Sequence, residues 1–429
     1  MVKPGYKQTE FGIIPETWTW VTFRECFNVL PNNTLSRSEL NYDAGSVWNI
    51  HYGDILVKFP AVLQPAQKLP YINNEHAAKI IKGFLQDGDL IIADTAEDTT
   101  VGKAVEISGV GDRKIVSGLH TIPCRPKDPD KFAAGWLGYF ANSNVYHDQL
   151  LPLITGTKVS AVSRAAIADT VLLLPPEREQ RRIVEALADA DGLIISAEKL
   201  IAKKKAIKRG TMQELLTGRK RLSGFHEEWT TKKVGEIATM YAGGTPDTNN
   251  PNYYNGPHPW VSISDISSVK KYISNTQKSL TDLGLQNSSA KIFPVGTLLF
   301  AMYASIGKCC ITKCEACSSQ AILGLYNLKG CEVEFLYYVF LHREKDFLEM
   351  GQTGTQANLS KQIVEDIILR LPSLEEQRAI ASVLASIDED IAVLEQKASK
   401  YRQIKQCMMQ QLLTGKIRLV QEEDGCGQL

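Results

Sequence analysis

Apolar residues recur at alternating steps of four and three along two long stretches of the chain. This spacing is typical of a helix that carries one narrow apolar stripe, as in a coiled coil. The expected helix-pair contacts are Ile183, Leu187, Ile194, Ile201 and Leu215 in the first stretch, and Ile380, Leu384, Ile387, Ile391, Leu394, Met408 and Leu412 in the second. The later half of the first stripe is more polar, with Lys204, Lys208 and Thr211. Each stripe must be covered, and we expect the two helices, each about 60 Å long, to cover one another.

The two stretches are copies of one another. Glu179-Gln180-Arg181 returns as Glu376-Gln377-Arg378, and the offset of 197 (377 − 180) holds through Leu215-Leu216-Thr217-Gly218 and Leu412-Leu413-Thr414-Gly415. Each copy begins after a proline turn and ends on Thr-Gly, which are helix start and stop signals.

Short apolar runs between Gly, Pro, Asn and Asp fill the rest of the chain and predict strands and turns with a few helices. The second such region echoes the first: Trp229 follows the pattern around Trp18, Trp260 to Asp265 resembles Trp48 to Asp54, and Ile306-Gly307-Lys308 resembles Val101-Gly102-Lys103. We predict a first globule over residues 1–173, a first long helix over 174–222, a second globule over 223–370, a second helix over 371–419 and a polar tail over 420–429.

Two copies of one unit that pair through their helices are most simply related by a twofold axis, which makes the helices antiparallel. The predicted fold class is therefore α+β: two mixed α/β globules joined and spaced by two long antiparallel coiled-coil helices with pseudo-twofold symmetry. Divergent loops on a common scaffold would let the two globules recognise different things. A long ligand with a repeat of its own, such as duplex DNA, suits this arrangement.

Composition limits the alternatives. The 429 residues suggest more than one domain, and 48 basic against 48 acidic residues argue against a polybasic, nonspecific nucleic-acid binder. Nine scattered cysteines suit a reducing compartment. We find no signal peptide and no apolar run of membrane-spanning length, so we expect a soluble, cytoplasmic protein.

An ordered set of short motifs runs through the second half of the chain. It comprises Gly243-Gly244-Thr245-Pro246, Pro259-Trp260-Val261-Ser262, Ser288-Ser289 with Lys291, Ile306-Gly307-Lys308, Ser319-Gln320-Ala321 and Gly354-Thr355-Gln356-Ala357-Asn358-Leu359. With the repeated helix, this set resembles the specificity subunit of type I DNA restriction-modification systems, over nearly the whole chain. The first globule departs from the pattern, with Asn32-Asn33-Thr34 at the place of the Gly-Gly-Thr-Pro loop and Leu119-His120-Thr121 at the place of Ser319-Gln320-Ala321.

The resemblance implies a non-catalytic subunit whose globules are target recognition domains, each reading one half of a bipartite, asymmetric DNA site. The implied partners are double-stranded DNA, two adenine methyltransferase subunits and restriction subunits, with no membrane. The chain itself would bind no cofactor, while the complex, an endonuclease and N6-adenine methyltransferase, would use S-adenosylmethionine, ATP and magnesium through other subunits. Apolar residues outside the helix contact are candidates for docking these subunits: Leu193, Ile195, Leu200, Val383 and Val393. Two alternatives stay open, a specificity subunit of a related methyltransferase-nuclease system and a standalone DNA-binding adaptor.

Specific readout of DNA requires donors and acceptors at base edges, while Lys and Arg hold phosphates. In the second globule the candidates are Gly243, Gly244, Thr245, Ser288, Ser289, Lys291, Lys308, Gln320, Thr355, Gln356 and Asn358. In the first globule they are Lys58, Lys103, Arg113, Lys114, His120 and Lys158. For each of these residues the competing interpretation is an ordinary solvated loop position.

Catalytic and metal sites are less well supported. Asn250-Pro251-Asn252-Tyr253 resembles a methyltransferase motif but lacks its second proline, and the Gly-Lys pairs lack the other residues of a phosphate-binding loop. Cys309, Cys310, Cys314 and Cys317 form the densest cysteine cluster, but adjacent cysteines in a strand point to opposite faces. We therefore predict neither a catalytic site nor a metal site.

Overall fold

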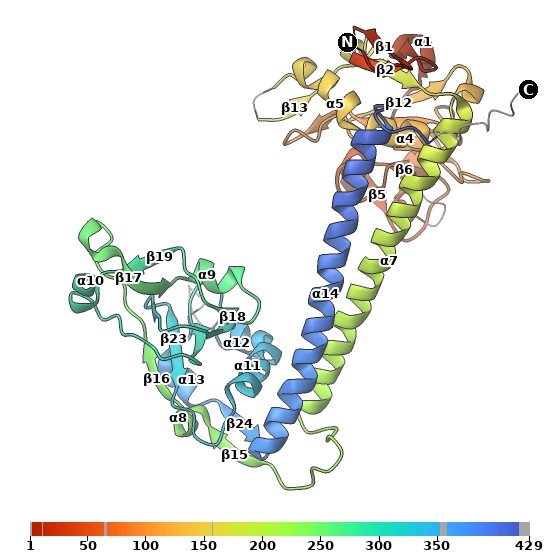
Figure 1. Cartoon of the computed structure of the whole chain (residues 1–429). Helices are drawn as coiled ribbons and strands as arrows, with labels where there is room; N and C mark the ends of the chain where they lie inside the picture. Colours follow the sequence, from red (N-terminus) through yellow and green to blue (C-terminus); the bar gives the residue numbers. More distant parts are fainter. Residues whose placement is uncertain (1, 11, 64–66, 157, 352–357, 420–429) are drawn as a thin grey trace, which may run out of the picture. The chain divides into compact units, whose positions relative to one another are not determined.

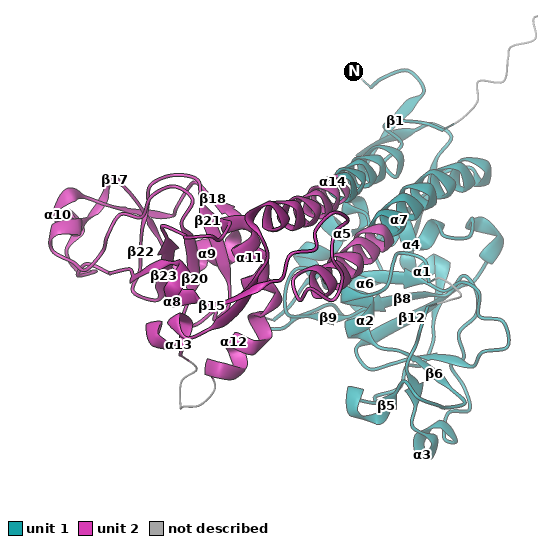
Figure 2. Cartoon of the chain, turned by 90° about the horizontal axis from the view of Figure 1, so that it is seen from below, with its two compact units in different colours: residues 1–197, 397–429 teal, residues 198–396 magenta. Residues whose placement is uncertain are grey.

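The computed structural model describes residues 2–10, 12–63, 67–156, 158–351 and 358–419. The chain forms two compact units: unit 1 is Met1–Ala197 with Lys397–Leu429, and unit 2 is Glu198–Gln396 (Figures 1 and 2). Each unit contains one globule and one half of each long helix, α7 (Glu177–Leu215) and α14 (Leu374–Leu412). The colour change within both helices in Figure 2 marks this division.

Unit 1 contains two four-stranded sheets. The first has the order β10 (Ala104–Glu106), β8 (Leu90–Ala93), β12 (Thr121–Pro126) and β4 (Phe27–Val29), with antiparallel neighbours. The second has the order β11 (Ile115–Ser117), β6 (Trp48–Ile50), β7 (Tyr71–Ile72) and β5 (Leu40–Asn41), with β11 parallel to β6. Among the described residues of the unit, three further strand pairs form: β1 (Tyr6–Thr9) with β2 (Gly12–Pro15), β9 (Thr95–Ala96) with β13 (Ser160–Ala161), and β3 (Thr19–Thr22) with β14 (Val171–Leu174).

Short helices connect these strands. They are α1 (Phe23–Cys26), α2 (Tyr52–Val57), α3 (Asn74–Ala77), α4 (Trp136–Ala141), α5 (Asn144–Leu150) and α6 (Arg164–Ile167), with 3-10 turns η1 (Arg37–Glu39), η2 (Pro129–Lys131) and η3 (Leu151–Leu153). The core contains Trp18 and Trp136, whose ring centroids lie 6.4 Å apart edge to face. Ile183 of α7 and Leu412 of α14 are buried in the same core. The helix ends are thus held by the globule as well as by one another.

Unit 2 repeats this strand order. Its five-stranded sheet runs β16 (Thr239–Ala242), β23 (Ile322–Tyr326), β20 (Leu298–Ala301), β21 (Cys309–Thr312) and β18 (Tyr272–Ile273). Its three-stranded sheet runs β19 (Lys278–Leu280), β17 (Tyr254–Val261) and β22 (Cys317–Ser318), with β17 parallel to β22, and β15 (Thr230–Lys233) pairs with β24 (Ile368–Leu371). β16, β23, β20 and β21 correspond in order to β4, β12, β8 and β10 of unit 1. The sequence repeat is therefore also a repeat of fold.

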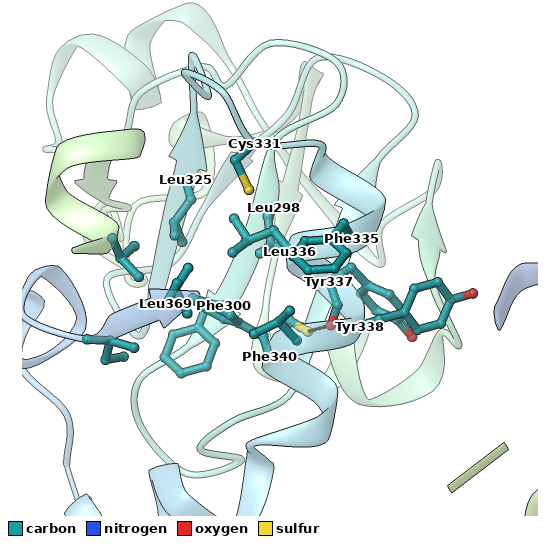
Figure 3. Close-up of a cluster of buried hydrophobic side chains, with 14 of the residues drawn as sticks. Leu298, Phe300, Leu325, Cys331, Phe335, Leu336, Tyr337, Tyr338, Phe340 and Leu369 are labelled. Carbon is teal, nitrogen blue, oxygen red and sulfur yellow. Dashed lines mark hydrogen bonds between the residues drawn. The ribbon is translucent and has the colours of Figure 1, made fainter. Parts of the chain in front are cut away.

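The helices of unit 2 pack into the main core or into the smaller cores beside it. They are α8 (Val234–Ile237), α9 (Ile263–Ser268), α10 (Asp282–Gln286), α11 (Val333–His342), α12 (Glu344–Gly351) and α13 (Lys361–Glu365), with the 3-10 turn η4 (Pro251–Tyr253). Figure 3 shows side chains of α11, including Phe335, Leu336 and Phe340, packed against Leu298 and Phe300 of β20. The mostly apolar sequence of α11 explains why it is a buried helix.

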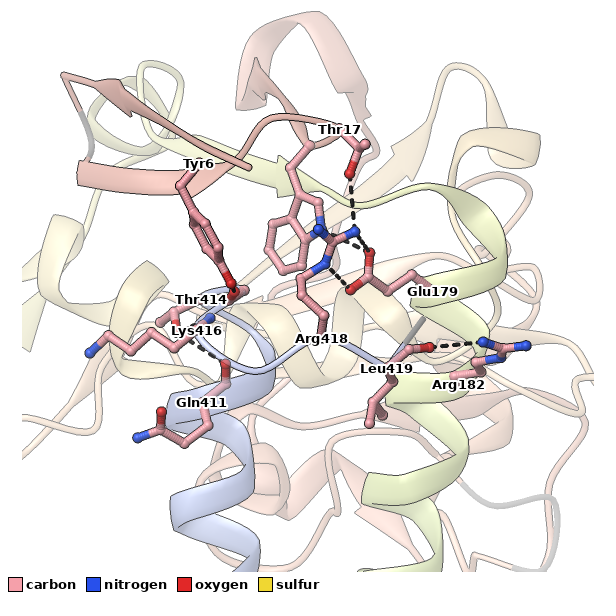
Figure 4. A network of polar contacts seen from close by, with 11 residues as sticks. Tyr6, Thr17, Glu179, Arg182, Gln411, Thr414, Lys416, Arg418 and Leu419 are labelled. Atoms are coloured by element: carbon pink, nitrogen blue, oxygen red, sulfur yellow. Dashed lines mark hydrogen bonds and ion pairs between the residues drawn. The ribbon is translucent and has the colours of Figure 1, made fainter. Parts of the chain in front are cut away.

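The two long helices are antiparallel within each unit. In unit 1, Arg418, which follows α14, pairs with Glu179 near the start of α7 at 2.6 Å (Figure 4). Lys405, which comes earlier in the chain than Arg418, pairs at 2.6 Å with Asp191, which comes later in α7 than Glu179, so the two segments run in opposite directions. In unit 2 the same contacts recur with the helices exchanged: Arg221 with Glu376 at 2.5 Å and Lys208 with Asp388 at 2.6 Å. Both members of each pair shift by the offset of 197 (418 − 221 and 376 − 179). The predicted fold class, mixed α/β globules with two long antiparallel helices, is confirmed.

Glycines end both helices as the sequence predicts. Gly218 and Gly415 have φ values of 72° and 70°, in the left-handed region that glycine adopts without strain. In the described part of the chain, no helix is both long and apolar enough to cross a lipid bilayer.

Candidate nucleic-acid interface

The loop after β16 is fixed by close approach of the backbone. Gly243 donates its N–H to the Ile322 carbonyl at 3.0 Å, and Gly244 donates to the Ser318 carbonyl at 2.8 Å. A Cβ atom on Gly244 would lie 2.3 Å from the backbone nitrogen of Ala290, so no larger residue fits without movement. The two glycines therefore bring Thr245 next to the loops that begin at Ser288 and Ser319.

Several of the predicted contact residues meet around this loop. The Thr245 hydroxyl donates a hydrogen bond to Gln320, and the Lys291 ammonium lies 3.9 Å from the centroid of the Tyr241 ring. Ser288 instead donates its hydroxyl to the Gly284 carbonyl at 2.8 Å. Ser288 thus stabilises its own turn, while Thr245, Gln320 and Lys291 form the polar surface beside it.

Lys308 and Asn358 lie on loops that join the same surface. Met302 N–H donates to the Ala321 carbonyl at 2.9 Å, and Leu359 N–H donates to the Met302 carbonyl at 3.0 Å, which places these loops side by side. Both predicted residues are exposed. Thr355 and Gln356 fall outside the described residues.

In unit 1, Lys58 belongs to a small charge cluster. Its ammonium lies 2.8 Å from the buried carboxylate of Asp54, which also accepts a bidentate pair from Arg37 at 2.8 and 2.9 Å. Burial opposes ionisation of Asp54, but the hydrogen bonds from Arg37 and Lys58 outweigh it and lower the pKa of this carboxyl. Two cations around one carboxylate leave an excess positive charge near α2.

His120 and Lys103 lie on either side of the loop after β8. His120 has a φ of 56°, and its exposed ring meets the Tyr52 ring edge to face at a centroid distance of 5.3 Å. Lys103 is half-buried, and its ammonium donates to the Leu56 carbonyl at 2.7 Å. Burial, with the nearby charge of Lys405, lowers the Lys103 pKa. Lys103 is therefore held inward, whereas His120 remains accessible.

The remaining candidates of unit 1 are less closely placed. Arg113 donates to the Gly109 and Val110 carbonyls at 2.5 and 3.2 Å, which closes its own turn. Lys114 and Lys158 are exposed. The structure thus gives Arg113 a local structural contact and leaves the two lysines in solvent.

Strand register shows that two of the sequence echoes were aligned one residue out. Ser117 pairs with Ile50 in parallel, as Ser318 pairs with Val261, so the structural counterpart of Trp260 is Asn49 and not Trp48. By the same register, Ser319-Gln320-Ala321 corresponds to Gly118-Leu119-His120, not to Leu119-His120-Thr121. The conspicuous tryptophans led the sequence comparison to the wrong register.

The register also identifies residues that the sequence candidates missed. Asn33 N–H donates to the Ser117 carbonyl at 2.9 Å, the counterpart of the bond from Gly244 to Ser318. The Asn33 side-chain amide donates to the Asn49 Oδ1 at 2.7 Å, whereas in unit 2 the Trp260 indole donates to the Gly244 carbonyl at 3.0 Å. Unit 2 pairs a large residue with glycine, and unit 1 pairs two asparagines. In the sequence, this site was indicated only by the position of Asn32-Asn33-Thr34, which corresponds to that of the Gly-Gly-Thr-Pro loop.

The expected helix-pair residues differ in burial. Ile183, Leu187, Ile194, Leu215, Ile380, Leu384, Ile391 and Leu412 are buried, and Ile201, Ile387, Leu394 and Met408 are half-buried. Where the stripe of α7 becomes polar, Lys204 pairs with Asp390 at 2.6 Å. The ion pairs explain how a partly polar stripe still faces a helix.

The cysteine cluster divides among three separate apolar cores. Cys309 packs in the main core of unit 2, Cys310 in the core with Val261 and Phe293, and Cys317 in the core with Trp260. Burial raises the pKa of the Cys310 thiol to about 12, which disfavours the thiolate that metals bind. Among the described residues, no group of three or more His, Cys, Asp or Glu is arranged to hold a metal ion.

Asn250, from the methyltransferase-like motif, uses its side-chain oxygen to accept the Asn252 N–H at 3.1 Å in a local turn.

Comparison with known proteins gives a consistent result. Residues 226–402 match the family described as the type I restriction modification DNA specificity domain. Over 97% of the chain and 97% of the relative, the sequence is 23% identical to a putative type I restriction enzyme MjaX specificity subunit of Methanocaldococcus jannaschii. The MjaIX specificity subunit of the same organism is 30% identical over 38% of each chain. The fold is similar to the crystal structure of a type I restriction-modification system S subunit from M. genitalium, with a TM-score of 0.55 at 13% identity over 92% of this chain and 96% of that one.

Proposed function

We propose that this chain is a specificity subunit of a type I restriction-modification system, a non-catalytic protein that recognises a DNA sequence, and that its two globules read the two halves of one bipartite, asymmetric DNA site. The observation that carries the proposal is the different chemistry at equivalent positions of one loop and of the strand that packs beneath it. Gly244 and Trp260 of unit 2 stand where Asn33 and Asn49 stand in unit 1. Equal backbones with unequal loop side chains should read unequal sequences.

We further propose that the exposed apolar side chains of the long helices bind partner subunits. Leu193 and Ile195 of unit 1 are 50% and 40% exposed, and Leu200 and Val393 of unit 2 are 50% and 62% exposed. Apolar side chains repeated along a helix surface are typical of an interaction site. The proposed occupants are two adenine methyltransferase subunits, with restriction subunits added to them. S-adenosylmethionine, ATP and magnesium would be bound by these partners.

Co-expression with its methyltransferase tests the assembly. We expect the full chain to purify with about twice its molar amount of methyltransferase, and the complex to methylate adenines within a site of two separated half-sequences. Exchanging residues 223–370 for those of a relative should change one half-sequence and leave the other intact. A change in both halves would contradict the assignment of one half-site to each globule. Tight specific binding by the chain alone, with no methyltransferase recovered, would instead support a standalone adaptor.

A further inference from the structure

The loop that follows α3 in unit 1 presents an unusually exposed apolar side chain. Ile81 is 82% exposed, although its neighbours Ile80 and Phe84 pack against a small core that contains Val47 and Val116. The loop is therefore anchored on both sides of Ile81. Leaving a large aliphatic side chain in water gives no benefit to folding, since its burial would be favourable by about 1.5–3 kcal/mol.

A cavity of about 480 Å³ opens beside this side chain. It lies between the loop and the Asn32-Asn33-Thr34 segment, and its lining also includes His76, Lys79 and Lys82. None of the described residues that line it carries a carboxylate. Both lysines are exposed and bring positive charge to the rim, while the carboxylates of Glu75 and Glu39 lie 3.2 and 3.6 Å from the His76 ring.

The corresponding place in unit 2 is closed. Leu85 N–H donates to the Ile115 carbonyl, and Phe293 N–H donates to the Ala316 carbonyl, so Leu85 corresponds to Phe293. Ile81 lies four residues before Leu85, and Ser289 lies four residues before Phe293 (85 − 81 and 293 − 289), so Ile81 corresponds to Ser289. Ser289 and Ala290 pack directly against Gly244 in unit 2. The exposed isoleucine and the cavity are therefore features of unit 1, on a loop whose counterpart already belonged to the candidate DNA surface.

We propose that residues 79–82 form a DNA-contact element of the first globule, in which Ile81 makes an apolar contact with bases in a groove while Lys79 and Lys82 hold the flanking phosphates. This inference rests on the proposed function. An aliphatic side chain recognises apolar surface at the base edges, above all the thymine methyl group, or enters between base steps. Lysines on either side supply the phosphate contacts that position it. Ser289 offers a hydroxyl at the same place, so the two globules differ there in the kind of group that they can recognise.

The substitution Ile81→Ser tests the apolar contact, because it installs the residue that unit 2 has at this place. In the complete complex with methyltransferase, we expect selectivity at one or two positions of the half-site read by the first globule to fall on the order of tenfold, with the other half-site unchanged. Ile81→Leu should keep most of the selectivity. The matched control is Ile13→Ser, since Ile13 is a 51% exposed isoleucine of β2, also in unit 1. Methylation of DNA with randomised half-sites gives the readout.

Unchanged selectivity of the Ile81→Ser complex would overturn the proposal, while a wild-type complex that still reads two half-sites would leave the proposed function standing. Loss of methyltransferase from the Ile81→Ser complex would also overturn it, because Ile81 would then contact protein and not DNA.

The lysines are tested by the salt dependence of DNA binding. Lys79→Gln combined with Lys82→Gln should reduce the magnitude of the slope of log K against log salt by about 1.8, the value for two phosphate contacts, for any DNA sequence. Lys127→Gln combined with Lys131→Gln removes two exposed lysines elsewhere in unit 1 and should leave the slope unchanged. Equal slopes for both variants would contradict the phosphate contacts.

Discussion

Single residues distinguish two globules that share one strand order. At equivalent positions, the indole of Trp260 reaches the Gly244 carbonyl, whereas the short side chain of Asn49 reaches the side chain of Asn33. A large residue opposite glycine and two medium residues opposite one another are alternative ways of filling the same space. The exchange changes what the adjoining loops can present without altering the sheets beneath them.

Glu106 also distinguishes unit 1, since it pairs with Leu90 as Ile311 pairs with Leu298 in unit 2. It predicts that the stability of the chain depends on pH. Its carboxylate is 2% exposed and accepts the N–H groups of Gly135 and Gly138 at 2.6 and 2.9 Å. Desolvation outweighs these hydrogen bonds and raises the Glu106 pKa from 4.5 to about 7. The folded chain then holds this proton more tightly than the unfolded chain. The contribution of Glu106 to stability is therefore fully present below pH 4.5 and is lost as pH rises through 7, a change of about 3 kcal/mol.

Urea unfolding of the full chain at pH 5 and pH 8 measures this effect. Glu106→Gln keeps the shape of the side chain but cannot titrate, so its unfolding free energy should fall less between the two pH values than that of the wild type. The same pH dependence in both proteins would show that Glu106 does not titrate in this range.

The residues of the candidate interface could be predicted only in part from the sequence. Thr245 and Gln320 belong to motifs that follow one another in a recognisable order along the sequence, and the structure places the two residues in contact. Asn49 and Ile81 belong to no motif, and the residues at the equivalent positions of unit 2 are of another type. Their equivalence depends on hydrogen-bond register between strands far apart in the chain. Periodicity along the sequence shows which face of a strand is buried, but it does not show which residue of a distant strand lies opposite.

At the scale of elements, the helix pair is the part that the sequence predicted best. Regular spacing identified the apolar stripe, and proline and glycine marked the ends. The charged part of the stripe could be explained only from the structure, where Lys204 pairs with Asp390 and Lys208 with Asp388, each at 2.6 Å. The shorter elements were predicted only as a class, because strands of two to four residues such as β22 and β20 depend on their neighbours for register.

Two glycines inside α7 are positions at which substitution by alanine should increase stability. Gly192 and Gly210 are exposed, and a Cβ atom at either position would meet nothing within 4 Å. At the same places α14 has Glu389 and Cys407 (389 − 192 = 197 and 407 − 210 = 197). Gly192→Ala and Gly210→Ala should therefore each raise the free energy of unfolding by about 0.5–1 kcal/mol, because alanine has the higher helix propensity.

Gly218→Ala is the control for these substitutions. Gly218 has a φ of 72°, so alanine there should lower the free energy of unfolding. Chemical denaturation of the three variants compares the effects directly. A loss of stability in the Gly192 or Gly210 variants would contradict the assignment of those positions to a regular, exposed helix surface.

At the scale of the whole molecule, the offset of 197 ties both helices to one length, because ion pairs at equivalent positions recur in both units. The pairs of Lys405 with Asp191 and Lys208 with Asp388 are the clearest example. A change of length in one helix alone would break this correspondence. Equal changes in both helices preserve it, which makes paired deletion the appropriate test of what the helices do.

We expect the length of the helices to set the number of base pairs between the two half-sites. Removing one heptad from each, residues 201–207 with 398–404, deletes equivalent segments, leaves the exposed apolar residues proposed to bind methyltransferase in place, and shortens both helices by about 10 Å, or about three base pairs of DNA. The deletion complex should methylate sites with the same half-sequences and a shorter spacer, since the loops of both globules are untouched. Deleting residues 201–207 alone is the control, and it should impair assembly because the ion pairs lose register. A paired deletion that folds, binds methyltransferase and keeps the original spacer would show that helix length does not determine spacing.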